Sequence, residues 1–154
     1  MQGVTGTIIP ETIPFFDLVV ELGESPLENI GVSGTIPVMQ RTMLKSKIHG
    51  AVLTGANLHY EGSIAIDPIL LEAADILPNE QVQVLNVNNG SRITTYAIVA
   101  ERGSGTVMLN GPAARAGIPG DVVIILTYAH IDANELAGYA PKIVKVDPQN
   151  RTVS

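Results

Sequence analysis

Residues 81–100 read QVQVLNVNNGSRITTYAIVA and carry the clearest structural signal in the chain. Two segments rich in β-forming residues, 81–88 and 92–100, flank the pair Asn89-Gly90. An Asn-Gly pair between such segments is the strongest short-range signal of a β-hairpin, because both residues tolerate the positive φ angles of a tight turn. The sequence therefore predicts a hairpin here, within a mainly β domain.

Short β-rich segments separated by turn residues continue on both sides of this hairpin. We predict further strands at residues 44–54, 63–67, 106–109, 122–128 and 142–146. The run at 122–128 is continuously apolar, which predicts a fully buried strand. Short helices are predicted at residues 68–74, 113–116 and 132–137. For the first of these, Asp67 offers an N-cap and Pro68 a first helical position. The regular spacing of turns favours a small barrel or sandwich.

The composition of the chain excludes several functional classes. The chain has 154 residues, 45% of them hydrophobic, a net charge of -6 and no Cys. This length suits one compact core, and the lack of Cys excludes disulfides, thiolate nucleophiles and Cys-based zinc sites. The negative charge disfavours nucleic acid and anionic membranes, and no apolar run approaches the roughly 20 residues of a membrane span. We expect a soluble protein with no nucleic-acid or membrane partner.

The first 40 residues differ from the remainder. They contain five acidic residues and no Lys or Arg, and Gly and Pro interrupt every apolar piece. We predict an irregular acidic leader at 1–40 and a β domain at 41–154. A secretory signal would need a basic start, and a transit peptide would be rich in Arg, so a cytoplasmic location is expected. The leader is either a genuine appendage or a misassigned start, with Met39 or Met43 as the true first residue.

One Gly-Ser pair has a setting that suggests chemistry. In YEGSIAIDP, residues 60–68, a flexible turn leads Ser63 directly into a predicted strand. Gly62 permits backbone conformations closed to other residues, so the peptide bond between them can be held under strain with the Ser63 hydroxyl aimed at the Gly62 carbonyl. From the residues alone, an ordinary tight turn is the alternative. The three histidines lack metal-ligand spacing, so no metal site is predicted.

Several separate blocks carry a resemblance to a known family. They are residues 43–49 (MLKSKIH), 60–63 (YEGS), 89–90 (NG), 95–96 (TY), 101–104 (ERGS), 110–111 (NG) and 120–125 (GDVVII). In order and spacing these blocks resemble the bacterial aspartate 1-decarboxylase family, from about residue 41 to about residue 146. The resemblance implies a double-psi β-barrel with short helices, assembled as a homotetramer with active sites between neighbouring subunits.

The resemblance also implies self-processing. The Ser63 hydroxyl would attack the Gly62 carbonyl, and elimination and hydrolysis of the resulting ester would release ammonia and leave a pyruvoyl group at position 63. This self-generated pyruvoyl group would be the cofactor. It would form a Schiff base with L-aspartate and accept electrons as CO2 leaves, giving β-alanine for pantothenate and coenzyme A biosynthesis. Whether cleavage is spontaneous or needs an accessory maturation protein is left open.

Roles for further residues follow from the family's motif positions. Thr95 would hold the tetrahedral intermediate of self-cleavage, and Tyr96 would return a proton as general acid. Lys47 and Arg92 would bind the two carboxylates of aspartate. The remaining implied substrate-binding residues are His49, Tyr60, Asn110, Gly111, Pro112 and Ala113. Each residue taken singly is also explained as a β-former, a surface charge or a turn residue.

Two positions depart from the family pattern. Gly50 stands where a basic Arg is usual, and Pro112 interrupts a segment that usually reads Asn-Gly-Ala-Ala, which removes one backbone N–H. Two other functions are kept as alternatives. One is an uncleaved, non-catalytic barrel that serves as a binding or regulatory module. The other is a pyruvoyl decarboxylase that acts on a different amino acid.

Overall fold

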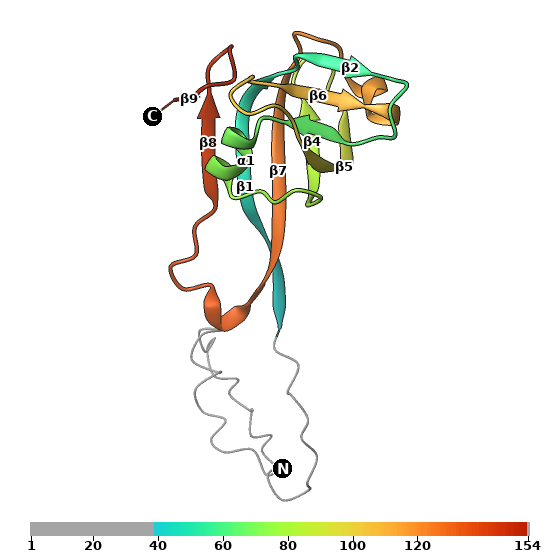
Figure 1. Ribbon diagram of the computed structural model, residues 1–154. Coiled ribbons are helices and arrows are strands. Elements are labelled where there is room, and N and C mark those ends of the chain that lie inside the picture. Colours follow the sequence, from blue (N-terminus) through green and yellow to red (C-terminus); the bar gives the residue numbers. More distant parts are fainter. Residues whose placement is uncertain (1–38, 154) are drawn as a thin grey trace, which may run out of the picture. The chain divides into compact units, whose positions relative to one another are not determined.

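The structure, a computed structural model, describes residues 39–153, which form a mainly β domain with short helices (Figure 1). The strands are β1 (Gln40–Val52), β2 (Gly55–Asn57), β3 (Ile64–Ile66), β4 (Gln81–Asn86), β5 (Arg92–Val99), β6 (Val107–Asn110), β7 (Val122–Asp132), β8 (Lys142–Val146) and β9 (Thr152–Val153). The helices are α1 (Pro68–Ala74) and the 3-10 helices η3 (Gly111–Ala116) and η4 (Ala133–Glu135). No helix among the described residues is long and apolar enough to cross a membrane.

The strands form one mixed sheet in the order β2-β6-β3-β5-β4-β7-β1-β8-β9. In this sheet, β1 and β3 each have one parallel and one antiparallel neighbour. β1 lies between antiparallel β7 and parallel β8, and β3 lies between antiparallel β6 and parallel β5. The mixed order and this repeated arrangement agree with the predicted double-psi β-barrel, and the mainly β fold class is confirmed.

The predicted hairpin is confirmed, with a longer turn than expected. β4 and β5 pair antiparallel from Gln81 opposite Tyr96 to Leu85 opposite Arg92. β4 ends at Asn86, two residues before the predicted end, because the Asn86 side chain accepts the N–H of Asn88 at 2.8 Å and so starts the turn. Such a local side-chain bond competes with the ladder and ends the strand.

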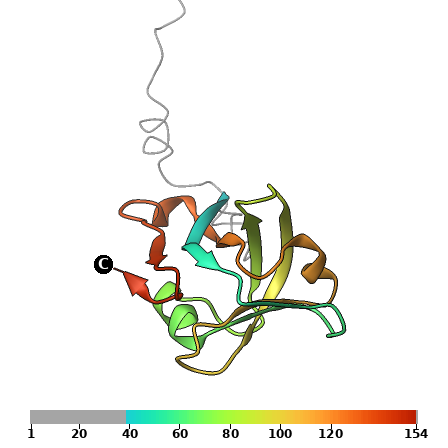
Figure 2. The ribbon, with the colours of Figure 1, turned by 90° about the horizontal axis from the view of Figure 1, so that it is seen from above.

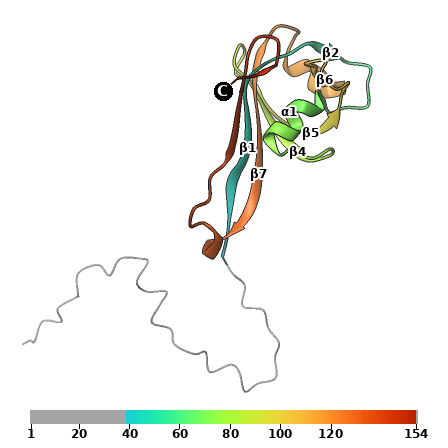
Figure 3. The same ribbon diagram turned by 60° about the vertical axis from the view of Figure 1, so that its left-hand side comes forward.

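The prediction that residues 122–128 are fully buried is wrong. β7 instead runs on to Asp132 and pairs with β1 along its whole length, so the two strands lie side by side in Figures 1 and 3. Val123 and Ile125 are fully buried, whereas Val122 and Ile124 are half-buried and Tyr128 is 46% exposed. Successive side chains of a strand point to opposite faces, and the face of Val123 and Ile125 is more fully buried than that of Val122 and Ile124.

The core lies between the sheet and helix α1. Its largest fully buried side chains include Ile48, Leu53, Ile64, Ile66, Leu70, Leu109 and Ile125. Helix α1 has the predicted bounds, and it buries Leu70, Leu71 and Ala74. Helices α1 and η3 lie at opposite sides of the domain in the view from above (Figure 2). The helix predicted at 132–137 shortens to η4, and η3 begins two residues before its predicted start.

A buried carboxylate joins the start of α1 to a distant loop. Asp67 is 1% exposed, and it accepts the N–H groups of Ile69 at 2.9 Å, Gly103 at 3.1 Å and Gly105 at 2.7 Å. Burial raises the pKa of Asp67, but these three hydrogen bonds and the charge of Arg151 oppose it and leave the pKa below its ordinary value.

The lowered pKa gives a testable pH dependence. A carboxyl whose pKa is lower in the folded state stabilises the fold above its unfolded pKa of about 4, and this contribution is lost as the pH falls through the folded pKa. We expect Asp67→Asn to lose about 1–3 kcal/mol of stability at pH 7, because its amide cannot accept all three bonds. We also expect a shallower loss of stability below about pH 4. Urea unfolding from pH 3 to 7 measures both; equal slopes in the two proteins would contradict the assignment.

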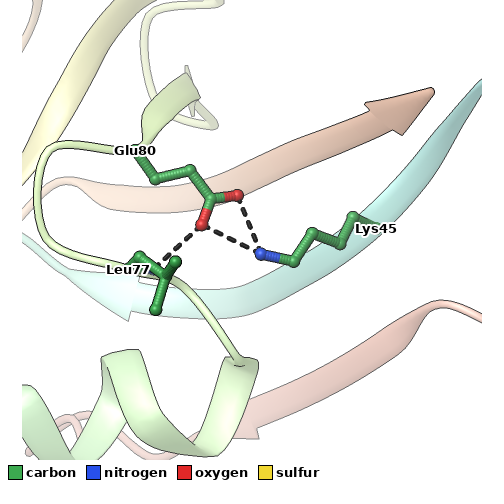
Figure 4. A network of polar contacts seen from close by, with 3 residues as sticks. All are labelled: Lys45, Leu77 and Glu80. Atoms are coloured by element: carbon green, nitrogen blue, oxygen red, sulfur yellow. Dashed lines mark hydrogen bonds and ion pairs between the residues drawn. The ribbon is translucent and has the colours of Figure 1, made fainter.

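A second polar contact fixes the long strand β1. Lys45 Nζ lies 2.9 and 3.0 Å from the two carboxylate oxygens of Glu80, and Glu80 Oε2 also accepts the N–H of Leu77 at 2.9 Å (Figure 4). Lys45 occupies the irregularity in β1 where the pairing with β7 shifts register, between Leu44 and Ser46. The two charged side chains are only 25% and 19% exposed, so water screens the pair less than it would at the surface. The contact ties β1 to the loop between α1 and β4.

We expect Glu80→Gln to destabilise the domain by about 1 kcal/mol, because the substitution keeps an acceptor for Leu77 and removes the charge that faces Lys45. Urea unfolding at low and at high salt measures the effect, which should shrink as salt screens the pair. Glu101→Gln, at an exposed position, is the matched control and should leave stability unchanged. A loss independent of salt in Glu80→Gln would count against an ionic contribution.

Candidate active site

The Gly62-Ser63 pair lies directly before β3, between β5 and β6. Ile64 pairs with Ala97 of parallel β5 and with Leu109 of antiparallel β6. Extending both registers by one residue puts Ser63 beside Tyr96 on one side and Asn110 on the other. The backbone N–H of Asn110 donates to the Ser63 carbonyl at 2.9 Å, which confirms the second of these neighbours.

The backbone at this pair is strained. Gly62 has a φ of 131° and Ser63 a φ of 94°. The second value lies in a region that residues with a β-carbon rarely adopt, and such a conformation costs on the order of 1–3 kcal/mol. It persists only where the surrounding structure over-determines it. The sequence predicted strain made possible by Gly62. The structure places the strain on Ser63, because a glycine adopts a positive φ without steric cost.

Gly111 allows the close approach that helps to hold this segment. Its φ is 58°, and a β-carbon there would lie 2.6 Å from the Tyr60 carbonyl oxygen, 2.8 Å from Gly62 Cα and 2.9 Å from Gly62 N. All three are backbone atoms that cannot swing away. Only glycine therefore lets the start of η3 pack against the residues that precede Ser63.

A pocket of about 340 Å³ opens beside the strained pair. Its lining residues are Glu61, Gly62, Ser63, Ile93, Thr94, Thr95, Tyr96, Asn110, Pro112 and Ala113. The fold thus brings together most of the residues that the sequence singled out, from three separate stretches of chain. Pro112 fits here because it occupies the first turn of η3, where a helix does not use the backbone N–H.

Asn110 forms a side-chain hydrogen bond with the serine hydroxyl. It is 1% exposed, and its Nδ2 lies 3.4 Å from Ser63 Oγ, a long hydrogen bond. Its Oδ1 is buried and has no hydrogen-bond partner among the described residues. A buried acceptor without a partner costs about 1–3 kcal/mol, which makes it a candidate for binding a donor during a reaction.

Tyr96 lies close to Gly62. A β-carbon built at Gly62 would be 3.9 Å from the Tyr96 hydroxyl, and the Tyr96 side chain is 42% exposed. Thr95 precedes it in β5 and is half-buried at the same pocket. The pocket therefore has a phenol and an alcohol within the short segment of β5 that faces the serine.

Other predicted site residues lie elsewhere in the single chain. Lys47 and His49 are on β1, which β4 and β7 separate from β5. Arg92 is exposed at the start of β5, and its Nη1 donates to Gln83 Oε1 at 3.1 Å. Tyr60 is 49% exposed and is not among the pocket residues, although its carbonyl oxygen lies close to Gly111. Their roles stay predictions, because the resemblance places the active site between subunits.

The sequence did not indicate three of the lining residues: Glu61, Ile93 and Thr94. Glu61 stands inside the YEGS block, which was the available signal. Residues 93–96 line one pocket although neighbouring side chains alternate between the faces of a strand. The cause is that β3 pairs only with residues 97–99 of β5, so the earlier part of β5 has no strand on that side. Among residues 39–153, no group of three His, Cys, Asp or Glu side chains could hold a metal ion.

Comparisons with known proteins agree with this site. The model of a family described as aspartate decarboxylase matches residues 39–153. A relative from Thermoanaerobacter pseudethanolicus, named aspartate 1-decarboxylase, is 59% identical over 116 residues, which are 75% of this chain and 99% of that protein. Relatives with the same name from Syntrophobacter fumaroxidans and Pelotomaculum thermopropionicum are 59% and 60% identical, over 75% and 73% of this chain and 94% and 85% of their own lengths.

The matched region contains the whole of the described domain, the strained Gly62-Ser63 pair and the pocket beside it. With identities this high over nearly the full length of the relatives, the chain belongs to the aspartate decarboxylase family.

Proposed function

We propose that this protein decarboxylates L-aspartate to β-alanine and CO2, after it has cut its own backbone between Gly62 and Ser63. The names of its relatives support the reaction. One observation carries the cutting step. Both residues of the pair have positive φ angles, and the Ser63 side chain lies beside Asn110 at the pocket. A serine held in a strained backbone conformation, with its hydroxyl beside a hydrogen-bonding side chain, suits an intramolecular acyl shift.

Self-cleavage consumes one water molecule and releases one ammonia. Ser63 Oγ attacks the Gly62 carbonyl carbon, the C–N bond breaks, and the acyl group passes from nitrogen to oxygen. Loss of the Ser63 Cα proton then expels the Gly62 carboxylate. Water replaces the nitrogen of the resulting dehydroalanine, which leaves as ammonia. The products are a chain that ends at Gly62 and a chain that starts with a pyruvoyl group at position 63.

The polar groups around Ser63 suit this chemistry. We assign Thr95, through its hydroxyl, to stabilise the oxyanion that forms at the Gly62 carbon. Asn110 Nδ2 orients Ser63 Oγ. Strain in the Ser63 backbone raises the energy of the intact amide, and breaking the bond releases that strain, so it lowers the barrier to the first step.

The residues present also fit a pyruvoyl group at position 63. Asn110 Oδ1 is a buried acceptor without a partner among the described residues, and the pocket beside it is large enough for a small amino acid. When present, the group supplies a ketone that condenses with an amine and accepts the electron pair left by CO2. Asn110 would then orient the substrate amine, and Tyr96 would deliver the proton that replaces the departing carboxylate.

The pocket lining of a single chain has no cation to pair with the two carboxylates of aspartate. Glu61 is the one Asp, Glu, Lys or Arg in the pocket lining, and its side chain is a carboxyl group. Because Lys47 and Arg92 are absent from this lining, we propose that a neighbouring copy of the chain supplies these cations, together with His49 and Tyr60, in a homotetramer. Buried sites for anionic groups depend on such paired charges.

The biological setting follows from the same proposal. The domain at 41–154 would act in the cytoplasm, where β-alanine feeds pantothenate biosynthesis, and an accessory maturation protein would set the rate of cutting if it is slow. Residues 1–40 are proposed as an acidic leader outside the catalytic domain; they lie almost entirely outside the described residues.

Replacing the serine tests the proposal most directly. We expect wild-type protein, aged after purification, to give two chains by intact mass spectrometry, split between Gly62 and Ser63, and to release β-alanine from L-aspartate. Ser63→Ala should stay whole and inactive because it lacks the attacking oxygen. Ser91→Ala, in a Gly-Ser pair outside the pocket, is the matched control and should cut normally. A wild-type chain that stays whole would favour the non-catalytic barrel, and activity only on another amino acid would revise the substrate.

Removing one phenol oxygen separates cutting from turnover. We expect Tyr96→Phe to cut between Gly62 and Ser63 as wild type does, because its proposed role begins only after the pyruvoyl group exists. Its turnover of L-aspartate should fall by about 10²–10⁴-fold, the usual contribution of a positioned general acid. Turnover is normalised to carbonyl groups titrated with an amine probe. Tyr128→Phe is the control tyrosine; a Tyr96→Phe enzyme with full turnover would exclude Tyr96 as the acid.

A further inference from the structure

A buried asparagine near the end of the chain ties three distant segments together. Asn150 is 3% exposed and has a φ of 59°. Its Oδ1 accepts the N–H of Val52 at 2.8 Å, and its Nδ2 donates to the carbonyls of Val52 at 2.8 Å and Gly105 at 2.7 Å. One side chain thus joins the turn before β9 to the end of β1 and to the loop between β5 and β6.

The loop between β5 and β6 is also hydrogen-bonded to Asp67, on the side away from Asn150. The N–H of Gly105 donates to Asp67 Oδ2 at 2.7 Å, and the N–H of Gly103 donates to Asp67 Oδ1 at 3.1 Å. A β-carbon at Gly105, whose φ is 68°, would lie 2.7 Å from the carbonyl oxygen of Gln149. The loop therefore lies between Asp67 and the turn of Asn150 with no space for a side chain.

Asp67 transmits this constraint to the strand that carries the serine. It follows β3 directly, its backbone N–H donates to the Thr106 carbonyl at 2.8 Å, and Ser63 precedes the same strand at the other end. β3 has only three residues, which span about 10 Å at 3.3 Å per residue. A displacement at Asp67 would therefore reach Ser63, since nothing in so short a strand absorbs it.

Such support is needed because the strained backbone of Ser63 holds only while its surroundings over-determine it. We propose that Asn150, acting through Gly105 and Asp67, is a positioning residue for self-cleavage that keeps Ser63 aligned with the Gly62 carbonyl. The inference rests on the proposed function. Once the bond is cut, the strain is gone, and decarboxylation no longer depends on this clamp of Asn150, Gly105 and Asp67.

The test compares the cutting rate with the turnover of protein that has been cut. Asn150→Gly keeps a residue that accepts the positive φ and removes all three side-chain hydrogen bonds. We expect its cutting rate, followed by intact mass in the full chain, to be about tenfold lower than wild type, a change of about 1.4 kcal/mol in the barrier. Turnover per titrated carbonyl group should be unchanged. Tyr139→Phe, which loses one hydrogen bond to the Leu44 carbonyl, is the control and should cut at the wild-type rate.

The proposed role of Asn150 can be contradicted in several ways. Wild-type cutting in folded Asn150→Gly would overturn the clamp and leave the proposed function intact. A parallel fall in cutting and in turnover per carbonyl group would also overturn it, because that pattern indicates general damage to the fold. If Asn150→Gly does not fold, Asn150→Asp serves instead. It keeps the acceptor for the Val52 N–H, loses the donor to the Val52 and Gly105 carbonyls, and should again cut slowly. A wild-type chain that never cuts would reject both the clamp and the proposed function.

Discussion

A single backbone constraint organises this domain: Ser63 is held at a φ of 94°, where a residue with a side chain is strained. β3 extends from this residue between a parallel and an antiparallel neighbour, so its register is fixed on both edges. Gly111 then packs against the preceding backbone, at a distance that excludes any β-carbon. These contacts over-determine the conformation, and the pocket forms where β3 begins and leaves part of β5 uncovered.

The electrostatics of the pocket explain why one chain is not a complete enzyme under the proposed function. A substrate with two carboxylates needs cations, and the lining of the pocket offers the carboxylate of Glu61 instead. Lys47 lies on β1, and Arg92 begins β5 directly before the pocket residues but is not among them. Association of several copies would bring unlike charges together and would stabilise the complete site at the same time. Under the proposed function, the single chain would contribute the groups for self-cleavage, and the assembly would contribute recognition of the substrate.

Because the chain has no Cys, polar contacts take the place of the disulfides that stabilise many small domains. Asp67 joins helix α1 to the loop at 103–105, and the pair of Lys45 and Glu80 joins β1 to the loop before β4. Both contacts use long-range partners, so they close loops that a hydrophobic core alone would leave loose. The Asn150 side chain adds a third such closure near the C-terminus.

Local sequence determined much of this structure. The Asn89-Gly90 turn, the N-cap at Asp67 and the bounds of helix α1 depend on residues adjacent in the chain, and all were predicted. The family blocks indicated most of the pocket in advance. Three features were decided only by the tertiary structure: the half-exposed face of β7, the pocket lining at residues 93–94, and the hydrogen bonds of Asn150 to segments 45 and 98 residues away. The reason is physical: these features depend on which strands become neighbours, and the period of a strand does not specify its partner.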